Sequence, residues 1–368
     1  MIRPPDDTLP AAANEAAPTV ASLKGERLVI RADADGRIGM GHVMRCLALA
    51  QSWIGFGGTV RLACTAVPPA IAERYHAEGA EVVLHDRWPP QDLVDDAAAV
   101  VVDGLEITDS DMAAVVAAGL PLAIIDDMGH RPAYPGALVV NQNLHASHRL
   151  YAGKSDARLC LGPGWGLLRR EFRPTGAEPR PMPDFASRLL VLMGGADPKG
   201  YSALALDAVA AAAERIAGEP EVILVVGAAN PALPDLERRA ALLPVRIDVR
   251  HDVRDMAGLL GSVDLAVSAA GSTVLEMAVL GVPMIIGAQN ESEVGPAAAL
   301  ARTGAAVDIG PLEDLDPAVL VETVTALALD PERRSKLAEN ARTLVDGLGA
   351  DRVAATIAGL LPDQRGNS

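Results

Sequence analysis

The feature that most constrains the fold is a repeated alternation of short, continuous Val/Ile/Leu runs with segments of helical periodicity. Because such runs are apolar on both faces, they are typical of parallel strands covered on both sides by helices. The chain is therefore expected to be an α/β protein with parallel sheets. The runs stand at 27–33, 59–66, 80–85, 98–104, 121–127 and 137–143, and again at 188–195, 221–227, 244–250, 264–271, 282–288 and 305–310.

A proline-rich stretch, "EFRPTGAEPRPMPDFASR" at 171–188, divides this alternation into two series. Proline interrupts regular elements, so the stretch is the expected linker between two domains, and a chain of 368 residues is long enough for both. Ligands of such sheets bind at the carboxyl ends of the strands, and we expect the site in a cleft between the two. We predict a disordered tail over 1–26, a first domain over 27–175 and a second over 186–362.

The composition argues against several kinds of partner. The net charge is −16 and only 3% of residues are aromatic, so nucleic acid is not expected to bind. The N-terminus lacks the pattern of a signal peptide, and no apolar run is long enough to span a bilayer, so we expect a cytoplasmic protein without stable membrane association. The cysteines are scattered along the chain, which predicts buried thiols rather than a metal site or a disulfide framework: Cys46, Cys64 and Cys160. No cofactor is expected.

The loop after the first strand, in "RADADGRIGMGHVMRCLALAQ" at 31–51, holds the first candidate site. Its glycines let a ligand approach the backbone closely, but their spacing is G-x-x-G-x-G. Dinucleotide-binding loops have G-x-G-x-x-G and an acidic residue at the end of the next strand, which is missing here, so a nicotinamide enzyme is disfavoured. The glycines are Gly36, Gly39 and Gly41.

His42 falls in the first turn of the helix that follows, where the positive end of the helix dipole favours a neutral imidazole. A general base needs this neutral form, so His42 is the candidate catalytic residue. Asp33 or Asp35 is expected to orient it or to hold the charge that develops. Arg45, one turn further along, either pairs with one of these carboxylates or reaches a phosphate. The alternative is a histidine that caps the helix or fills the core.

The second series carries two loops suited to a diphosphate. In "LMGGADPKG" at 192–200, Gly194 and Gly195 precede a helix, and glycine amides at a helix start can bind phosphate. In "DLAVSAAGSTVLEMAVLGVP" at 264–283, Ser272 and Thr273 open a helix. Glu276 lies one turn in, where it either accepts the hydroxyls of a ribose or closes a capping box.

Further polar side chains follow other strands. Gln289 and Asn290, in "GAQNESEV" at 287–294, suit sugar hydroxyls or acetamido groups, although an ordinary solvated loop would look the same. In the first series, several side chains could line the substrate side of the cleft because they too follow strands: Asp103, Asp127, Asn141 and Asn143.

In the order in which they occur, these motifs resemble the PseG family of UDP-sugar hydrolases of pseudaminic acid biosynthesis, within the MurG-like GT-B superfamily. The resemblance runs from Leu28 to Gly310. It implies a GT-B-like fold, in which two Rossmann-like domains have parallel sheets that face a cleft. Its pieces are "RADADGRIGMGHVMRCLALA", "VVDG", "IIDDMGH", "VVNQN", "LGPGWGLLRREF", "LMGGADPKG", "SAAGSTVLEMAVLGVP" and "AQNES".

The resemblance implies hydrolysis of UDP-2,4-diacetamido-2,4,6-trideoxy-β-L-altropyranose to UDP and the free sugar. The family's catalytic histidine, in its G-x-G-H motif, maps onto His42, which would activate water for inverting attack at the anomeric carbon. The second domain would hold UDP through the loop at Gly194, the helix start at Ser272, and Glu276. The family's usual Asn-Gln pair is inverted here, as Gln289-Asn290, which leaves the sugar uncertain.

Two other functions compete with this expectation. A MurG-like glycosyltransferase would use the same UDP site with a sugar or lipid acceptor, but such enzymes dock on membranes through a basic amphipathic stretch that the sequence lacks. A non-catalytic two-domain binding protein would release no UDP. The expected partner in either enzyme is a small UDP-sugar, and the sequence does not indicate an oligomeric state.

Overall fold

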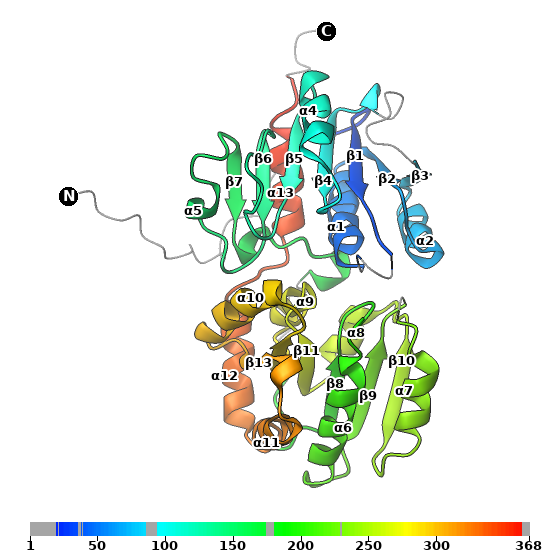
Figure 1. Ribbon diagram of the computed structural model, residues 1–368, viewed down its shortest axis with the longest axis vertical. Helices are drawn as coiled ribbons and strands as arrows, with labels where there is room; N and C mark the ends of the chain where they lie inside the picture. The colour runs from blue at the N-terminus through cyan, green and yellow to red at the C-terminus, as the bar shows by residue number, and fades with distance from the viewer. Residues whose placement is uncertain are drawn as a thin grey trace, which may run out of the picture. The chain divides into compact units, whose positions relative to one another are not determined.

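The computed structural model describes Val20, Ile38 and residues 22–35, 40–85, 94–173, 180–228 and 230–362. The chain divides into two compact units, each built on one parallel sheet (Figure 1). The first unit comprises residues 1–35, 42–170 and 347–368, and the second comprises 36–41 and 171–346. The predicted α/β class with two parallel-sheet Rossmann-like domains is confirmed.

The first unit holds a seven-stranded sheet in the order β3-β2-β1-β4-β5-β6-β7. All neighbouring strands run parallel, and the order reverses between β1 and β4. Ligands of doubly wound sheets bind at the carboxyl ends of strands beside such a reversal. The strands are β1 (Arg27–Ala32), β2 (Thr59–Cys64), β3 (Glu81–Leu84), β4 (Ala99–Asp103), β5 (Leu122–Ile125), β6 (Leu138–Asn141) and β7 (Arg158–Leu161).

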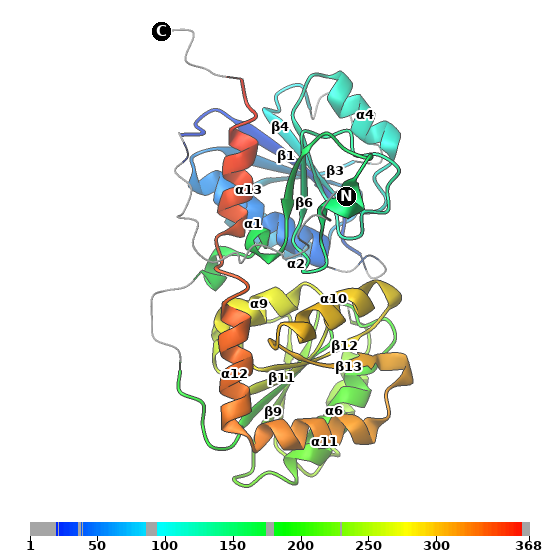
Figure 2. The same ribbon diagram turned by 90° about the vertical axis from the view of Figure 1, so that its left-hand side faces the viewer.

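Helices cover both faces of this sheet. In Figure 2, α1 and α13 lie on one side and α4 on the other. Val100 and Val102 of β4 pack with Met112 of α4 in a buried cluster, so the alternate residues of β4 face α1. The helices are α1 (Gly41–Gly55), α2 (Pro69–Ala77), α4 (Asp109–Ala117), α5 (His148–Tyr151), α13 (Gly349–Ala358) and the 3-10 turns η1 (Pro163–Trp165) and η2 (Arg170–Phe172).

The end of the chain returns to the first unit, which the sequence analysis does not anticipate, since it assigns 186–362 to the second domain. Helix α13 packs on η1: Arg352 Nη1 donates to the carbonyl of Gly164 at 2.8 Å. A Cβ on Gly349 would lie 2.3 Å from the carbonyl oxygen of Gly166, so this close approach requires glycine. These contacts join segments far apart in the sequence, and no local sequence pattern predicts them.

The second unit holds a six-stranded parallel sheet in the order β10-β9-β8-β11-β12-β13, which reverses between β8 and β11. Its core packs β8 and β9 against α6 and α11. The strands are β8 (Arg188–Leu192), β9 (Glu221–Val226), β10 (Ile247–His251), β11 (Leu265–Ala269), β12 (Met284–Ala288) and β13 (Val307–Pro311). The helices are α6 (Tyr201–Ala213), α7 (Leu233–Ala240), α8 (Met256–Gly261), α9 (Thr273–Leu280), α10 (Glu291–Arg302), α11 (Pro317–Ala328), α12 (Pro331–Arg342) and the 3-10 turn η3 (Leu312–Asp314).

Several details differ from the sequence expectations. The short edge strand β7 is not predicted, because its four residues begin with an exposed arginine. Leu23 falls in the predicted tail but is buried, and its N–H donates to the carbonyl of Phe56. Residues 1–19 of that tail lie outside the described residues. The three cysteines are buried and unpaired. In the described part of the chain, no helix is both long and apolar enough to cross a membrane.

Candidate functional site

His42 and Asp103 meet at the carboxyl edge of the first sheet, where the strand order reverses. His42 stands in the first turn of α1, directly after the loop from β1, and Asp103 ends the adjacent strand β4. Because Val102 faces α4, Asp103 faces α1. His42 Nδ1 lies 2.7 Å from Asp103 Oδ1; the imidazole is 25% exposed and the carboxylate 0%.

The contact with Asp103 favours one tautomer of His42. Arg45 Nη2, a donor, lies 3.2 Å from the same nitrogen, but Asp103 Oδ1 is closer, at 2.7 Å. A carboxylate only accepts hydrogen bonds, so Nδ1–H donates to Asp103 and Nε2 is the nitrogen that can accept a proton. The charge of Asp103 raises the pKa of His42 above its ordinary value, although burial opposes it. Burial alone would raise the pKa of Asp103, but the charges of Arg45 and His42 hold it well below its ordinary value. Asp103 therefore remains an anion that can stabilise an imidazolium.

Arg45 joins Asp103 to a second carboxylate. Its Nε and Nη2 each donate to Asp103 at 2.6 Å, and Nη1 and Nη2 donate to Asp127 at 2.8 and 2.9 Å. Burial would lower the pKa of this guanidinium, but the two carboxylates raise it well above its ordinary value. Arg45 is therefore a permanent cation in an ion-pair network, not a side chain free to bind phosphate.

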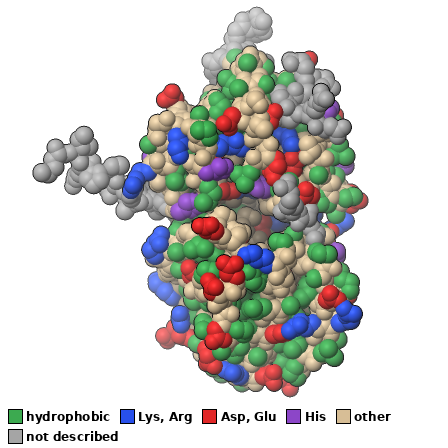
Figure 3. All heavy atoms as spheres, viewed as in Figure 1, with side chains coloured by type: hydrophobic (Ala, Val, Ile, Leu, Met, Phe, Trp, Pro, Cys, Tyr) green, Lys and Arg blue, Asp and Glu red, His purple; other side chains and the backbone are tan. Residues whose placement is uncertain are grey.

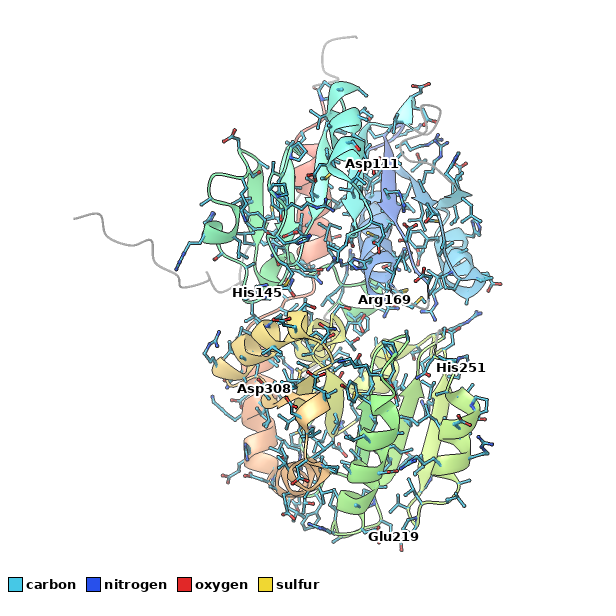
Figure 4. All side chains as sticks on the ribbon, viewed as in Figure 1. Asp111, His145, Arg169, Glu219, His251 and Asp308 are labelled. Carbon is cyan, nitrogen blue, oxygen red and sulfur yellow. The ribbon has the colours of Figure 1, made fainter. Side chains whose placement is uncertain are left out.

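Asp127 forms the outer end of this network. It follows β5, and its side chain is 37% exposed, in contrast to the 7% of Arg45. Asn143, after β6, donates from Nδ2 to Asp127 Oδ1 at 2.8 Å, and His145 Nε2 lies 2.9 Å from the carbonyl oxygen of Asp127. Figure 4 shows His145 and Arg169 at the same end of this unit. Histidine and acidic side chains also gather at this end in the space-filling view (Figure 3).

A buried hydrogen-bond cluster holds the loop that carries Asp127. The carboxylate of Asp126 accepts the hydroxyls of Tyr134 at 3.0 Å and Tyr151 at 2.7 Å, and the N–H of Gly129 at 2.6 Å. Asn141 Nδ2 donates to the Tyr151 hydroxyl at 2.9 Å. Because a fully satisfied buried network is rigid, this cluster restricts the direction in which Asp127 points.

The structure pairs Asp33 with Arg31 and Thr65, whereas the sequence left Asp33 as one possible partner of His42. Its carboxylate accepts Arg31 Nη2 at 2.6 Å and the N–H of Thr65 at 2.7 Å. The partner of both His42 and Arg45 is Asp103 instead. The sequence analysis places Asp103 at the right edge of the sheet but does not pair it with His42. Gly41 is the first residue of α1, and Gly39 lies outside the described residues.

In the second unit, Gly194 and Gly195 follow β8 beside the reversal of strand order. Gly194 has φ +77°, a left-handed conformation that favours glycine. A Cβ on the neighbouring Gly227 would lie 2.3 Å from the carbonyl oxygen of Gly195, so the loops after β8 and β9 pack backbone to backbone. In Figure 4, His251 at the end of β10 and Glu219 before β9 mark opposite ends of this sheet.

The first turn of α6 is occupied by a carboxylate of the protein itself. Asp197 is buried, has φ +43°, and accepts the N–H groups of Tyr201 at 2.9 Å and Ser202 at 2.8 Å. These two amides are therefore not available to a phosphate. From the sequence, the glycine loop is expected to bind phosphate, and the capping of α6 by Asp197 is not predicted.

The start of α9 is built differently. Ser272 is exposed, and its side chain makes no capping hydrogen bond; Thr273 begins the helix and is partly buried. The described structure therefore does not show the capping box that the sequence leaves open at Ser272. Glu276 is partly buried one turn further along. The amides and the dipole of a helix N-terminus favour negative charge, so the start of α9 is a candidate position for an anion.

Gln289 and Asn290 lie on the loop between β12 and α10. Gln289 Nε2 donates to the carbonyl of Met193 at 2.8 Å, which ties the loop after β12 to the end of β8. The N–H of Gln289 donates to Glu293 Oε2 at 2.9 Å. Asn290 is exposed and accepts the Ser292 hydroxyl at 2.5 Å. The amide nitrogen of Gln289 thus positions the loops, a role that its sequence does not indicate.

Among the described residues, no group of three or more His, Cys, Asp or Glu side chains could hold a metal ion. In the first unit, His42 is bonded to an ion-pair network at the edge of the sheet where the strand order reverses. In the second unit, the glycine loop after β8 and the start of α9 lie beside its own reversal of strand order.

Comparisons with known proteins place these features in context. No protein-family model matches the chain. It is 29% identical over 211 residues to the spore coat polysaccharide biosynthesis protein SpsG of Bacillus subtilis, covering 57% of this chain and 60% of that protein. It is 33% identical over 223 residues to the UDP-N-acetylglucosamine–N-acetylmuramyl-(pentapeptide) pyrophosphoryl-undecaprenol N-acetylglucosamine transferase of Acidithiobacillus ferrooxidans, covering 57% and 59%. The chain spans about half to three-fifths of the length of the curated relatives it matches.

Among solved structures, the crystal structure of Acinetobacter baumannii MurG has a TM-score of 0.61 at 16% identity, and the match covers 90% of this chain and 99% of that one. This likeness shows the fold. The predicted GT-B-like fold class is confirmed. The hydrolase family that the motifs suggest is not among the relatives described here.

Proposed function

We propose that this chain is an enzyme that takes the glycosyl group from a UDP-sugar and transfers it to an acceptor hydroxyl that His42 deprotonates. The observation that carries the proposal is the hydrogen bond between His42 Nδ1 and Asp103 Oδ1 at the edge where the strand order reverses. The Acidithiobacillus ferrooxidans relative, whose name is that of a UDP-N-acetylglucosamine transferase, supports the donor class.

The chemistry follows from the tautomer. As the acceptor oxygen attacks the anomeric carbon, His42 Nε2 takes its proton, and Asp103 stabilises the imidazolium that forms. The bond from the anomeric carbon to the phosphate oxygen breaks, and UDP leaves with the bonding electrons. Attack opposite the leaving group inverts the configuration. The buried anion of Asp103 makes His42 a stronger base than an isolated imidazole.

The second unit is proposed to hold the donor. Ser272 and Thr273 at the start of α9, with Gly194 and Gly195 after β8, would contact the diphosphate through N–H and hydroxyl groups. Glu276 would accept the hydroxyls of the ribose. The start of α9 is favoured over the start of α6, because Ser272 makes no capping hydrogen bond, whereas the amides of Tyr201 and Ser202 already bind Asp197.

Hydrolysis is the second candidate, and the order of the motifs from "RADADGRIGMGH" to "AQNES" favours it. The base and the UDP site would be unchanged, and water would replace the acceptor hydroxyl. The substrate would then be UDP-2,4-diacetamido-2,4,6-trideoxy-β-L-altropyranose, with Asn143, Gln289 and Asn290 near the sugar. In either case we propose a cytoplasmic enzyme, in keeping with its buried, unpaired cysteines.

The decisive experiment measures UDP release from UDP-N-acetylglucosamine and from the diacetamido sugar nucleotide, each with and without a lipid-linked sugar acceptor. Release that depends on the acceptor establishes the transferase. Release without acceptor establishes the hydrolase. If UDP neither binds in calorimetry nor is released from either donor, both candidates are rejected.

A further inference from the structure

The ion-pair network of the first unit contains two charged groups beyond the His–Asp pair, Arg45 and Asp127. Arg45 binds both oxygens of Asp103, the partner of His42. Its positive charge lowers the pKa of His42 and so opposes the larger effect of Asp103. A second carboxylate on Arg45 would offset this opposing charge and favour protonation of His42.

Asp127 is placed to do so. Arg45 Nη1 and Nη2 donate to its two oxygens, so the guanidinium is shared between two carboxylates. With Asp103, Asp127 and Arg45 together, the network carries one net negative charge while His42 is neutral and becomes neutral when His42 is protonated. We propose that Asp127 is a positioning residue that acts through Arg45: it offsets the positive charge of Arg45, so that Asp103 can stabilise His42 as an imidazolium. The inference rests on the proposed role of His42 as the base.

The other groups around His42 do not supply this charge. In the described part of the first unit, the charges acting on His42 are those of Asp103 from β4, Arg45 from α1 and Asp127 from the loop after β5. The thiol of Cys46 on α1 lies 3.5 Å from Asp103 Oδ2, but burial raises its pKa well above the ordinary value, so it stays neutral. The Nε2 atom of His145 contacts the backbone carbonyl of Asp127, not its carboxylate.

The test replaces Asp127 with a neutral side chain of the same shape, Asp127→Asn, and follows His42 by NMR titration in the free protein. The pKa of His42 is expected to fall, because the network loses its net negative charge. The acid limb of the kcat profile should then move to lower pH while its plateau drops several-fold, since a weaker base is a poorer catalyst. KM for the nucleotide sugar should stay within about twofold, because Asp127 works through Arg45 and not on the donor.

Two further variants complete the test. Asp127→Glu keeps the charge and should restore the His42 titration. Asp156→Asn removes the same charge from an exposed aspartate before β7, at the opposite end of the sheet, and should leave the titration unchanged. If Asp127→Asn does not fold, Asp127→Ser serves as the neutral variant.

A His42 titration that is the same in the neutral variant and the wild type overturns the proposal. So does a loss of activity with an unmoved titration, which would make Asp127 a substrate contact. Because the titration needs no substrate, it tests Asp127 even if the chain releases no UDP and the proposed function fails.

Discussion

The carboxyl edges of the two sheets share a topology and differ in chemistry. Each lies beside a reversal of strand order, between β1 and β4 in the first unit and between β8 and β11 in the second. The first edge gathers ionised side chains that bind one another, with Arg45 held between Asp103 and Asp127. The second carries a glycine loop after β8 and the start of α9, where Ser272 makes no capping hydrogen bond.

In the proposed function, this difference assigns proton transfer to one edge and anion binding to the other. Moving a proton requires a base with a fixed tautomer and a buried counter-charge, which long-range side-chain contacts supply. Binding an anion requires only backbone amides and a helix dipole, which local glycine and serine positions supply. If the two edges have different roles, a substitution at one edge should leave the property of the other unchanged.

The largest effect is expected for His42→Ala, which removes the base from the first edge. Turnover should fall by about 10²–10⁴-fold, the usual contribution of a general base. UDP affinity measured by calorimetry should not change, because the second edge is untouched. His148→Ala, at an exposed histidine on α5, is the control. Activity within about threefold of wild type would leave His42 with a structural role only.

Arg45→Met should destabilise the protein by about 3–5 kcal/mol in urea unfolding, because it leaves the buried Asp103 without a counter-ion. The difference in stability between the variant and the wild type should shrink as pH falls, because the unpaired Asp103 then takes up a proton and is buried as a neutral carboxyl. The control is Arg215→Met, which removes an exposed pair with Glu322 and should cost no more than about 1 kcal/mol. Equal losses in both variants would contradict the buried network.

The wild type should itself lose stability in acid. The pKa values of Asp103 and Asp127 lie below the ordinary 3.8, because Arg45 outweighs the opposing effect of burial. Depressed carboxylate pKa values stabilise the fold above the unfolded-state pKa, and this contribution disappears as pH falls through the folded-state values. Urea unfolding at a series of pH values below about 4 measures the loss. A flat profile there would mean that the network adds no stability.

At the second edge, Glu276→Ala should weaken UDP binding by about 1–3 kcal/mol, the cost of leaving ribose hydroxyls without a partner. Calorimetry measures the affinity, and the titration of His42 should be unchanged. Unaltered UDP affinity together with a loss of stability would return Glu276 to a capping role in α9.

The smallest effect is expected for Asp197→Ala, which uncaps α6. The free energy of unfolding should fall by about 1 kcal/mol, as for other lost helix caps. A rise in UDP affinity in this variant would show that Asp197 blocks an anion from the start of α6, because its loss exposes the amides of Tyr201 and Ser202. A variant as stable as wild type would show that the cap is not needed.

The sequence by itself determined the class of fold and the edges where chemistry gathers. Buried parallel strands leave continuous apolar runs, and the candidate site residues His42, Gly194 and Ser272 stand in the motifs that follow such runs. These are short-range properties, set within a few residues of each strand. Strand β7 is not predicted from the sequence, because it is short and partly exposed and so has no continuous apolar run.

Only the tertiary structure decided the partners. His42 pairs with Asp103, which is 61 residues away in sequence, rather than with the nearby Asp33. Strand β4 lies beside β1 in the sheet, and the alternation of side chains turns Asp103 toward α1. The return of α13 to the first unit is decided in the same way, by the fit of Gly349 against Gly166. Strand order and side-chain direction are properties of the assembled sheet, and no local pattern in the chain encodes them.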